Sequence, residues 1–286
     1  MTKKIFLLQF SLILLIFVFP PIFVKNGQNA ALDLSKFNFF VLLNFCAALL
    51  LLAQKRMEER QKAKDAETVA SPRGGGEPKT AARLGSAAEI KLFASQKGAA
   101  ALWRAAIFSS RVLVCYGALL LLGILFFVAQ RFFQNDAALT VELPQNVLGW
   151  LACAFALFAA ALFEETIYRW YLPHALATIA SAGGQTDKSP RAKEAAASGE
   201  NVASLKSAAK PEPFASQRRA RLAFWGTEAA CVVLFALAHR WQGALAVLNA
   251  LFGGIILRLC AVKSKGLAPG IAAHFLYNAS ALLFAL

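Results

Sequence analysis

Long runs of hydrophobic residues alternate with basic, alanine-rich stretches along most of the chain. A helix that crosses a hydrocarbon core of about 30 Å needs roughly 20 apolar residues, and several runs approach or exceed that length. The pattern therefore predicts an all-α, polytopic membrane bundle of about seven transmembrane helices. The predicted spans are 5–24, 37–53, 112–129, 147–177, 222–238, 243–260 and 269–286.

The first run, 5–24, follows the charged start MTKK and carries Pro20 and Pro21 near its end. A secretory signal peptide has the same charged start, so both interpretations apply to this segment. The run is long and has no clear small-x-small cleavage site. We therefore favour a first transmembrane span over a cleaved signal.

Two long connections, 54–104 and 181–221, carry many Lys and Arg residues and few large apolar ones. Basic residues beside spans favour the cytoplasm, which predicts two cytoplasmic loops and a cytoplasmic N-terminus. The resulting organisation is an N-terminal group of spans in 1–129 and a second transmembrane domain in 146–286. A nucleic-acid partner would also suit the formal charge of +14. However, these Ala/Ser/Gly-rich segments cannot bury enough apolar surface to form a binding domain, which favours solvated linkers. We therefore expect no nucleic-acid partner.

The stretch FEETIYR places two acids and an arginine inside the predicted span 147–177, directly after the apolar run LACAFALFAAAL. An ionisable side chain at the centre of a span costs about 2.5–3.5 kcal/mol on insertion scales, so each needs a partner or a purpose. Glu165 and Arg169 are four residues apart and can pair on one helix face, which leaves Glu164 pointing elsewhere. Ordinary charge in the headgroup region is the competing interpretation of this cluster.

Two further stretches place polar residues near spans. FALAH separates Phe235 from His239 by one helical turn, and HFLYN does the same for His274 and Asn278. A lone histidine in a span is more often a packing residue, and an asparagine often joins helices. Together with a leftover glutamate, however, two imidazoles and an amide can activate water and hold an oxyanion.

These three stretches resemble a known family. EETIYR fits E-E-x-x-x-R, FALAH fits F-x-x-x-H and HFLYN fits H-x-x-x-N, in that order and on separate predicted spans. This is the pattern of the CPBP (Abi) intramembrane proteases, which include the type 2 CAAX prenyl endopeptidases and bacterial proteins linked to lysostaphin resistance and bacteriocin self-immunity. The resemblance covers about residues 163–278, whereas the first three spans match only in being hydrophobic.

The resemblance implies a role for each matching residue. Glu164 would be the general base that activates water, assisted by His239, while His274 and Asn278 would stabilise the oxyanion. Glu165 and Arg169 would hold the site together, and Phe235 would structure it. The metal is left open, because Glu164, His239 and His274 could hold Zn²⁺ and a metal-free glutamate mechanism uses the same side chains.

We therefore predict an intramembrane metalloendopeptidase of the CPBP type, a glutamate-dependent hydrolase that cleaves a membrane-associated protein or peptide. Its expected location is a bacterial inner (plasma) membrane, with lipid and the substrate as partners. The alternatives are a non-enzymatic immunity or scaffold protein and a proton-coupled transporter whose intramembrane acids and histidines relay protons.

The two histidines are expected at different depths in the membrane, which makes it difficult to place both in one site. At 1.5 Å per residue, His274 lies about 13 Å beyond Lys265, whereas His239 lies about 27 Å beyond Arg221. A simple parallel bundle would separate the two histidines. We therefore expect long, tilted helices around a cavity that is open to the cytoplasm.

Overall fold

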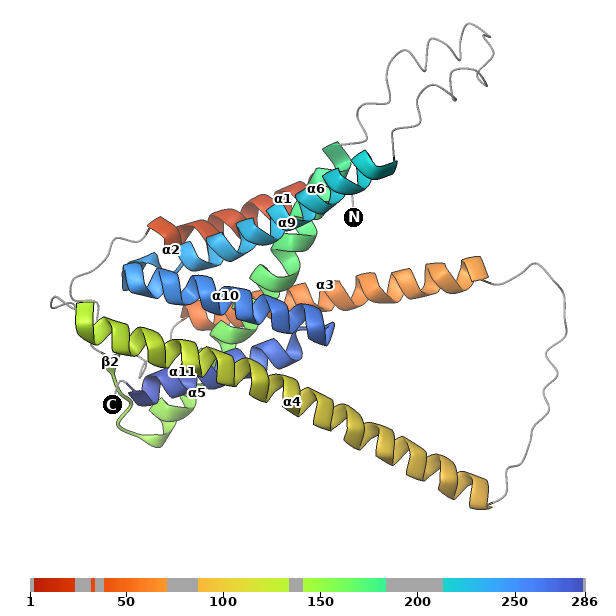
Figure 1. Ribbon diagram of the computed structural model, residues 1–286, viewed down its shortest axis with the longest axis horizontal. Coiled ribbons are helices and arrows are strands. Elements are labelled where there is room, and N and C mark those ends of the chain that lie inside the picture. Colours follow the sequence, from red (N-terminus) through yellow and green to blue (C-terminus); the bar gives the residue numbers. More distant parts are fainter. Residues whose placement is uncertain are drawn as a thin grey trace, which may run out of the picture. The chain divides into compact units, whose positions relative to one another are not determined.

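The computed structural model describes residues 3–23, 32–33, 39–70, 87–133, 141–183 and 213–284. These residues are almost entirely helical, which confirms the all-α prediction (Figure 1). The only strands among them are β1 (Leu32–Asp33) and β2 (Val141–Glu142), which form a short parallel pair.

Several consecutive helices are continuous and differ only in helical type, α or π. The elements of the N-terminal part are α1 (Lys3–Ile13), the π-helical η1 (Leu14–Val18), α2 (Phe19–Phe23), α3 (Phe39–Ala70) and α4 (Ala87–Phe133). The following segment is continuous through α5 (Val147–Thr166), the π-helical η2 (Ile167–Tyr171) and α6 (Leu172–Gly183). The C-terminal elements are α9 (Pro213–Leu237), the 3-10 helix η3 (Arg240–Gln242), α10 (Ala244–Ser264) and α11 (Ala268–Phe284).

Five helical stretches in the described part of the chain are long and apolar enough to cross a membrane: Ile5–Phe23, Phe39–Glu67, Ala100–Phe132, Val147–Ala180 and Ala244–Ser264. They correspond to five of the seven predicted spans. The other two predicted spans coincide with α9 and α11. Helix α9 begins with a basic segment, and α11 has only 17 residues, so neither is among the five stretches. The chain is thus an integral membrane protein, and the count of seven spans stays a prediction.

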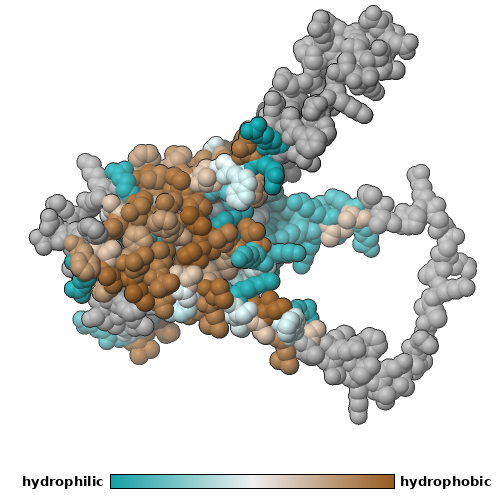
Figure 2. All heavy atoms as spheres, in the orientation of Figure 1, coloured by the Kyte–Doolittle hydropathy of each residue, from teal (hydrophilic) through white to brown (hydrophobic). Residues whose placement is uncertain are grey.

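The connection predicted over 54–104 is helical at both of its ends. Helix α3 continues 17 residues beyond Ala53, to Ala70, and α4 already begins at Ala87. Ala, Lys, Glu, Gln and Arg dominate these extensions and are strong helix formers, so the helix persists where hydrophobicity ends. Figure 2 shows mostly hydrophilic side chains along the second part of α3. Residues 71–86 lie outside the described part.

Side-chain pairs one turn apart support the hydrophilic part of α3. Gln54 Nε2 donates to Glu58 Oε1 at 3.0 Å, Lys55 Nζ pairs with Glu59 Oε1 at 2.6 Å, and Gln61 Nε2 donates to Asp65 Oδ1 at 2.8 Å. Each such pair contributes about 0.2–0.5 kcal/mol to an isolated helix. The second predicted loop, 181–221, is likewise shortened by α6 and α9, and its residues 184–212 are not described.

The chain divides into two compact units that interleave in sequence. The first comprises Met1–Ala30, Leu125–Thr140 and Ile167–Ile255, and the second comprises Ala31–Ile124, Val141–Thr166 and Ile256–Leu286. We call them unit 1 and unit 2 and describe each by itself.

Unit 2 has a core between α4, the end of α10 and α11. Its buried members are Val112, Cys115, Leu119, Leu257 and Ala273. Aromatic contacts fix α5 in the same unit: Phe45 of α3 meets Phe155 with ring centroids 5.1 Å apart, and Phe158 meets Phe275 of α11 at 6.1 Å. The end of α5 and the middle of α11 are therefore held together, which matters for the acids that follow.

Unit 1 is organised around the end of α9. Tyr168 of η2 packs edge-on against Phe235 of α9 with centroids 5.3 Å apart. Beyond α9, the chain turns through η3, where Arg240 Nη1 donates to the carbonyl of Ile22 at 3.3 Å. These contacts fix the position of the turn that carries His239 within the unit.

Candidate active site

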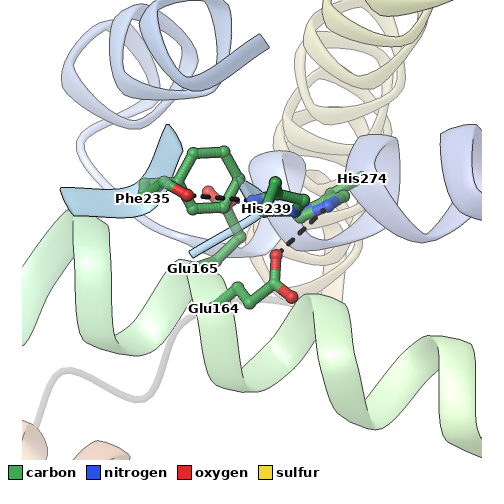
Figure 3. A network of polar contacts seen from close by, with 5 residues as sticks. All are labelled: Glu164, Glu165, Phe235, His239 and His274. Atoms are coloured by element: carbon green, nitrogen blue, oxygen red, sulfur yellow. Dashed lines mark hydrogen bonds and ion pairs between the residues drawn. The ribbon is translucent and has the colours of Figure 1, made fainter. Parts of the chain in front are cut away.

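Two adjacent acids and one histidine meet in unit 2. Glu164 and Glu165 lie in the last turn of α5, and His274 lies on α11. The Nδ1 of His274 is 3.2 Å from Glu165 Oε1, and its Nε2 is 3.7 Å from Glu164 Oε2. The imidazole therefore contacts both carboxylates, one through each nitrogen (Figure 3 shows the contact with Glu164).

The two carboxylates differ in accessibility. The Glu165 side chain is completely buried, whereas about a quarter of the Glu164 side chain is exposed (0% and 25%). A carboxylate accepts hydrogen bonds only, so Nδ1–H of His274 donates to Glu165. Glu165 thereby orients the ring. Glu164 is the partly exposed acid of the two, although its Oε2, which faces His274, is buried.

A π-helical turn follows directly after the acids. Residues Ile167–Tyr171 form η2, and its Arg169 side chain is only 3% exposed. Single π turns occur often at functional sites and break the regular α-helical spacing. An ion pair between Glu165 and Arg169 is expected where the helix is α-helical throughout, and η2 interrupts that geometry. That pair stays a prediction, and the contact of Glu165 with His274 is the one that the sequence argument missed.

Gly270 makes room for the buried acid. It lies on α11 one turn before His274, and a Cβ at this position would be 3.2 Å from Glu165 Oε2. That separation is tighter than most real contacts of a methyl group, so any side chain at 270 would push against the carboxylate. The signal in the sequence is a glycine four residues before a histidine in a predicted span.

In unit 1, Phe235 contacts both of its polar neighbours. The guanidinium carbon of Arg169 lies 4.3 Å from the centre of the Phe235 ring, a cation–π contact. The same ring meets the imidazole of His239 with centroids 4.8 Å apart. Phe235 is buried, and Gly254 lets it approach closely, because a Cβ there would be 3.0 Å from Phe235 Cδ1. The structure thus explains why a phenylalanine suits this position.

His239 lies in the turn after α9, just beyond the end of the helix. Its Nδ1 is 2.9 Å from the carbonyl oxygen of Phe235, which Figure 3 shows as a dashed line. A carbonyl only accepts, so Nδ1 carries the hydrogen, and in the neutral ring Nε2 carries the lone pair. Gly243, with φ +103°, completes the turn in a conformation that favours glycine. His239 can therefore accept a proton at Nε2.

Asn278 lies on α11 one turn after His274 and is partly buried. The structure thus brings Glu164, Glu165 and His274 together in unit 2, with Asn278 on the same helix as the histidine. Arg169, Phe235 and His239 come together in unit 1. A site composed of both sets stays a prediction.

The described residues do not form a metal site by themselves. No group of three His, Cys, Asp or Glu side chains among them lies close enough to hold an ion. Of the candidate ligands Glu164, His239 and His274, unit 2 contains two, and the Nδ1 of His274 is committed to Glu165. The zinc site therefore stays a prediction.

Comparison with known proteins identifies the C-terminal half. Residues 144–280 match the family model of Rce1-like proteins, described as type II CAAX prenyl endopeptidase Rce1-like. No curated protein and no solved structure matches the chain. The family match confirms the resemblance to the CPBP/CAAX proteases, and its range includes all residues of the predicted site. It supports, in broad terms, an intramembrane endopeptidase that acts on membrane-associated substrates.

Proposed function

We propose that this chain, whose residues 144–280 match the Rce1-like endopeptidases, hydrolyses a peptide bond in a membrane-associated protein or peptide, with Glu164 as general base. The observation that carries the proposal is the imidazole of His274 in contact with two carboxylates of unlike exposure. One acid orients the ring, and the side chain of the other is partly exposed.

Glu164 takes a proton from water as the water oxygen attacks the carbonyl carbon of the substrate. The separation of 3.7 Å between Glu164 Oε2 and His274 Nε2 exceeds a hydrogen bond, so the two atoms can both bond a reacting oxygen. The proton then passes from Glu164 to the leaving nitrogen as the C–N bond breaks. The products are a new amine and a new carboxylic acid, which gives up the second proton of the water to become a carboxylate.

His274 and Asn278 stabilise the oxyanion in this mechanism. With a proton on each nitrogen, the His274 ring donates to Glu165 from Nδ1 and to the oxyanion from Nε2. The Asn278 amide, one turn further along α11, is a second donor. His239 assists the base through the lone pair on Nε2, while Phe235 and Arg169 position its ring.

A substitution at Gly270 tests how strongly the reaction rate depends on the position of the Glu165 carboxylate. Gly270→Ala pushes on Glu165 Oε2 and so tilts the imidazole of His274, and we expect kcat to fall about ten-fold. The matched control is Gly117→Ala, because a Cβ at that helical glycine meets nothing within 4 Å. Cleavage kinetics of both variants, alongside thermal melting, give the comparison; equal rates would contradict the positioning role of Glu165.

Phe235 provides a second test, on the histidine of unit 1. Phe235→Leu keeps the site apolar but removes the ring beneath Arg169 and beside His239. We expect a loss of about 1 kcal/mol in the free energy of unfolding and a further, separate fall of several-fold in kcat. The control Phe126→Leu removes a ring that packs against Phe252 in the same unit. A kcat no lower than that of Phe126→Leu would overturn the proposed role.

The predicted zinc is tested by the metal content of the purified protein and by chelation. Cleavage that survives chelation would assign water activation to the carboxylate alone. Cleavage that is lost on chelation and returns with stoichiometric zinc would show that the reaction needs the metal. Loss of the bound zinc in His239→Ala and His274→Ala would then assign these histidines as ligands.

A further inference from the structure

Unit 2 contains a cavity that the proposed reaction does not use. It has a volume of about 330 Å³ and lies between α4 and the C-terminal end of α10. The buried core around Cys115, Leu119 and Leu257 closes its inner side. Val114, Ile256 and Leu259 form much of its apolar wall, and Ser110, Arg111 and Lys263 add polar groups to its lining.

A second hollow of about 470 Å³ shares Arg111 with the first. Arg104 and Phe108 of α4 line it, together with the turn from Ser264 to Pro269 that joins α10 to α11. The two hollows therefore adjoin at Arg111, and neither includes Glu164, Glu165 or His274 in its lining.

The charged side chains that line the two hollows are all basic, while the buried carboxylate of Glu165 interacts electrostatically with Cys260 of the first hollow. Arg104, Arg111 and Lys263 line the two hollows, and no Asp or Glu is among the lining residues. Arg111 Nη1 donates to the carbonyl of Ser264 at 3.3 Å, which ties its guanidinium to the end of α10. Such basic pockets between transmembrane helices suit the headgroups of anionic lipids.

The apolar side of the same cavity faces outward. Val114 and Leu259 are 74% and 53% exposed on helices that belong to membrane spans. Lipid chains surround such side chains in a bilayer. An acyl chain therefore suits the part of the cavity beside the wall that they form. A small soluble anion would fit the cations but would leave this wall unused.

We propose that the two hollows form a binding site for one anionic phospholipid. Its phosphate lies among Arg104, Arg111 and Lys263, and one acyl chain follows the wall formed by Val114, Ile256 and Leu259. The inference does not rest on the proposed protease activity, because it uses none of the residues of the reaction.

The test is a titration of the full-length protein in detergent with dioctanoyl phosphatidylglycerol and, separately, dioctanoyl phosphatidylcholine. The double variant Arg111→Gln/Lys263→Gln removes two cations, each of which contributes about five-fold in affinity, so we expect phosphatidylglycerol to bind roughly 25-fold more weakly. The double control Arg56→Gln/Arg131→Gln lowers the net charge equally at other places on α3 and α4. We expect it to stay within about two-fold of the wild type.

Val114→Trp keeps every cation and fills part of the cavity beside the apolar wall. This variant tests the proposal if the double variant does not fold. We expect it to weaken phosphatidylglycerol binding about ten-fold, because the acyl chain loses its place. Equal affinity for the two lipids, equal losses in test and control double variants, or displacement of phosphatidylglycerol by millimolar inorganic phosphate would each overturn the proposal. The last outcome would identify a simple anion site instead.

Discussion

Replacing Glu164 by glutamine is expected to lower kcat for peptide cleavage by about 10³-fold, within the range that general-base catalysis supplies. Glutamine keeps the size of the side chain and its contact with His274, but it cannot take a proton from water. Because about a quarter of this side chain is exposed, the change should leave the thermal stability nearly unaltered. The measurement is single-turnover cleavage of a membrane-anchored peptide by the purified protein.

The matched control for that variant is Glu165→Gln, next to it in the sequence. Glu165 is completely buried and hydrogen-bonded to His274 Nδ1, so its loss should lower both stability and kcat. Stability would fall by about 1–3 kcal/mol, the range for disturbing a buried hydrogen-bonded group. If Glu164→Gln instead destabilised the protein as much as Glu165→Gln and left kcat unchanged, the assignment of the two acids would be wrong.

His274→Ala is expected to cause the second large effect, a fall in kcat of about 10²–10³-fold, because an oxyanion donor is lost. The same change removes the hydrogen-bond partner of the buried Glu165 carboxylate, so the free energy of unfolding should drop by about 1–3 kcal/mol. Cleavage rates and thermal melting of one preparation test both parts together.

Asn278→Ala separates the two effects of His274→Ala. Asn278 is partly buried on the same helix and is expected to contribute only to the oxyanion. We therefore expect a fall in kcat of about 10²-fold with a change in stability of less than 0.5 kcal/mol. Should Asn278→Ala destabilise the protein and leave kcat unchanged, Asn278 would be a packing residue and its assigned role would be wrong.

Hydrophobic runs were enough to predict the helical membrane architecture, because lipid requires a closed set of backbone hydrogen bonds. The limits of the helices were harder to predict. The basic part of α3 beyond Ala53 is as helical as the apolar part before it, since Lys, Glu, Gln and Ala favour helices without being hydrophobic. Hydropathy predicts which residues meet lipid and does not predict where a helix ends.

In the candidate site, too, some features could be predicted from the sequence and others could not. The motifs indicated Glu164, His274 and Asn278, and the structure places the first two in contact on α5 and α11. The link between Glu165 and His274 joins residues 109 positions apart, which no spacing rule within one helix can predict. Likewise, η2 changes the helical period after Thr166, and the place that Gly270 leaves for Glu165 depends on packing between helices.

The alternatives to a protease predict different results for the same variants. A scaffold or immunity protein would keep its cellular effect in Glu164→Gln, because the fold is unaltered. A proton-coupled transporter would show activity that depends on a proton gradient and would form no cleavage product. The contact between Glu164 and His274 is compatible with all three, so a chemical product decides among them.

The most direct measurement is mass spectrometry of a membrane-anchored peptide incubated with the purified protein in heavy-oxygen water. The account predicts two fragments, with one heavy oxygen in the new carboxyl group, and no such fragments from Glu164→Gln at the same protein concentration. Equal cleavage by the wild type and Glu164→Gln would contradict the role of Glu164, and fragments without heavy oxygen would contradict hydrolysis itself.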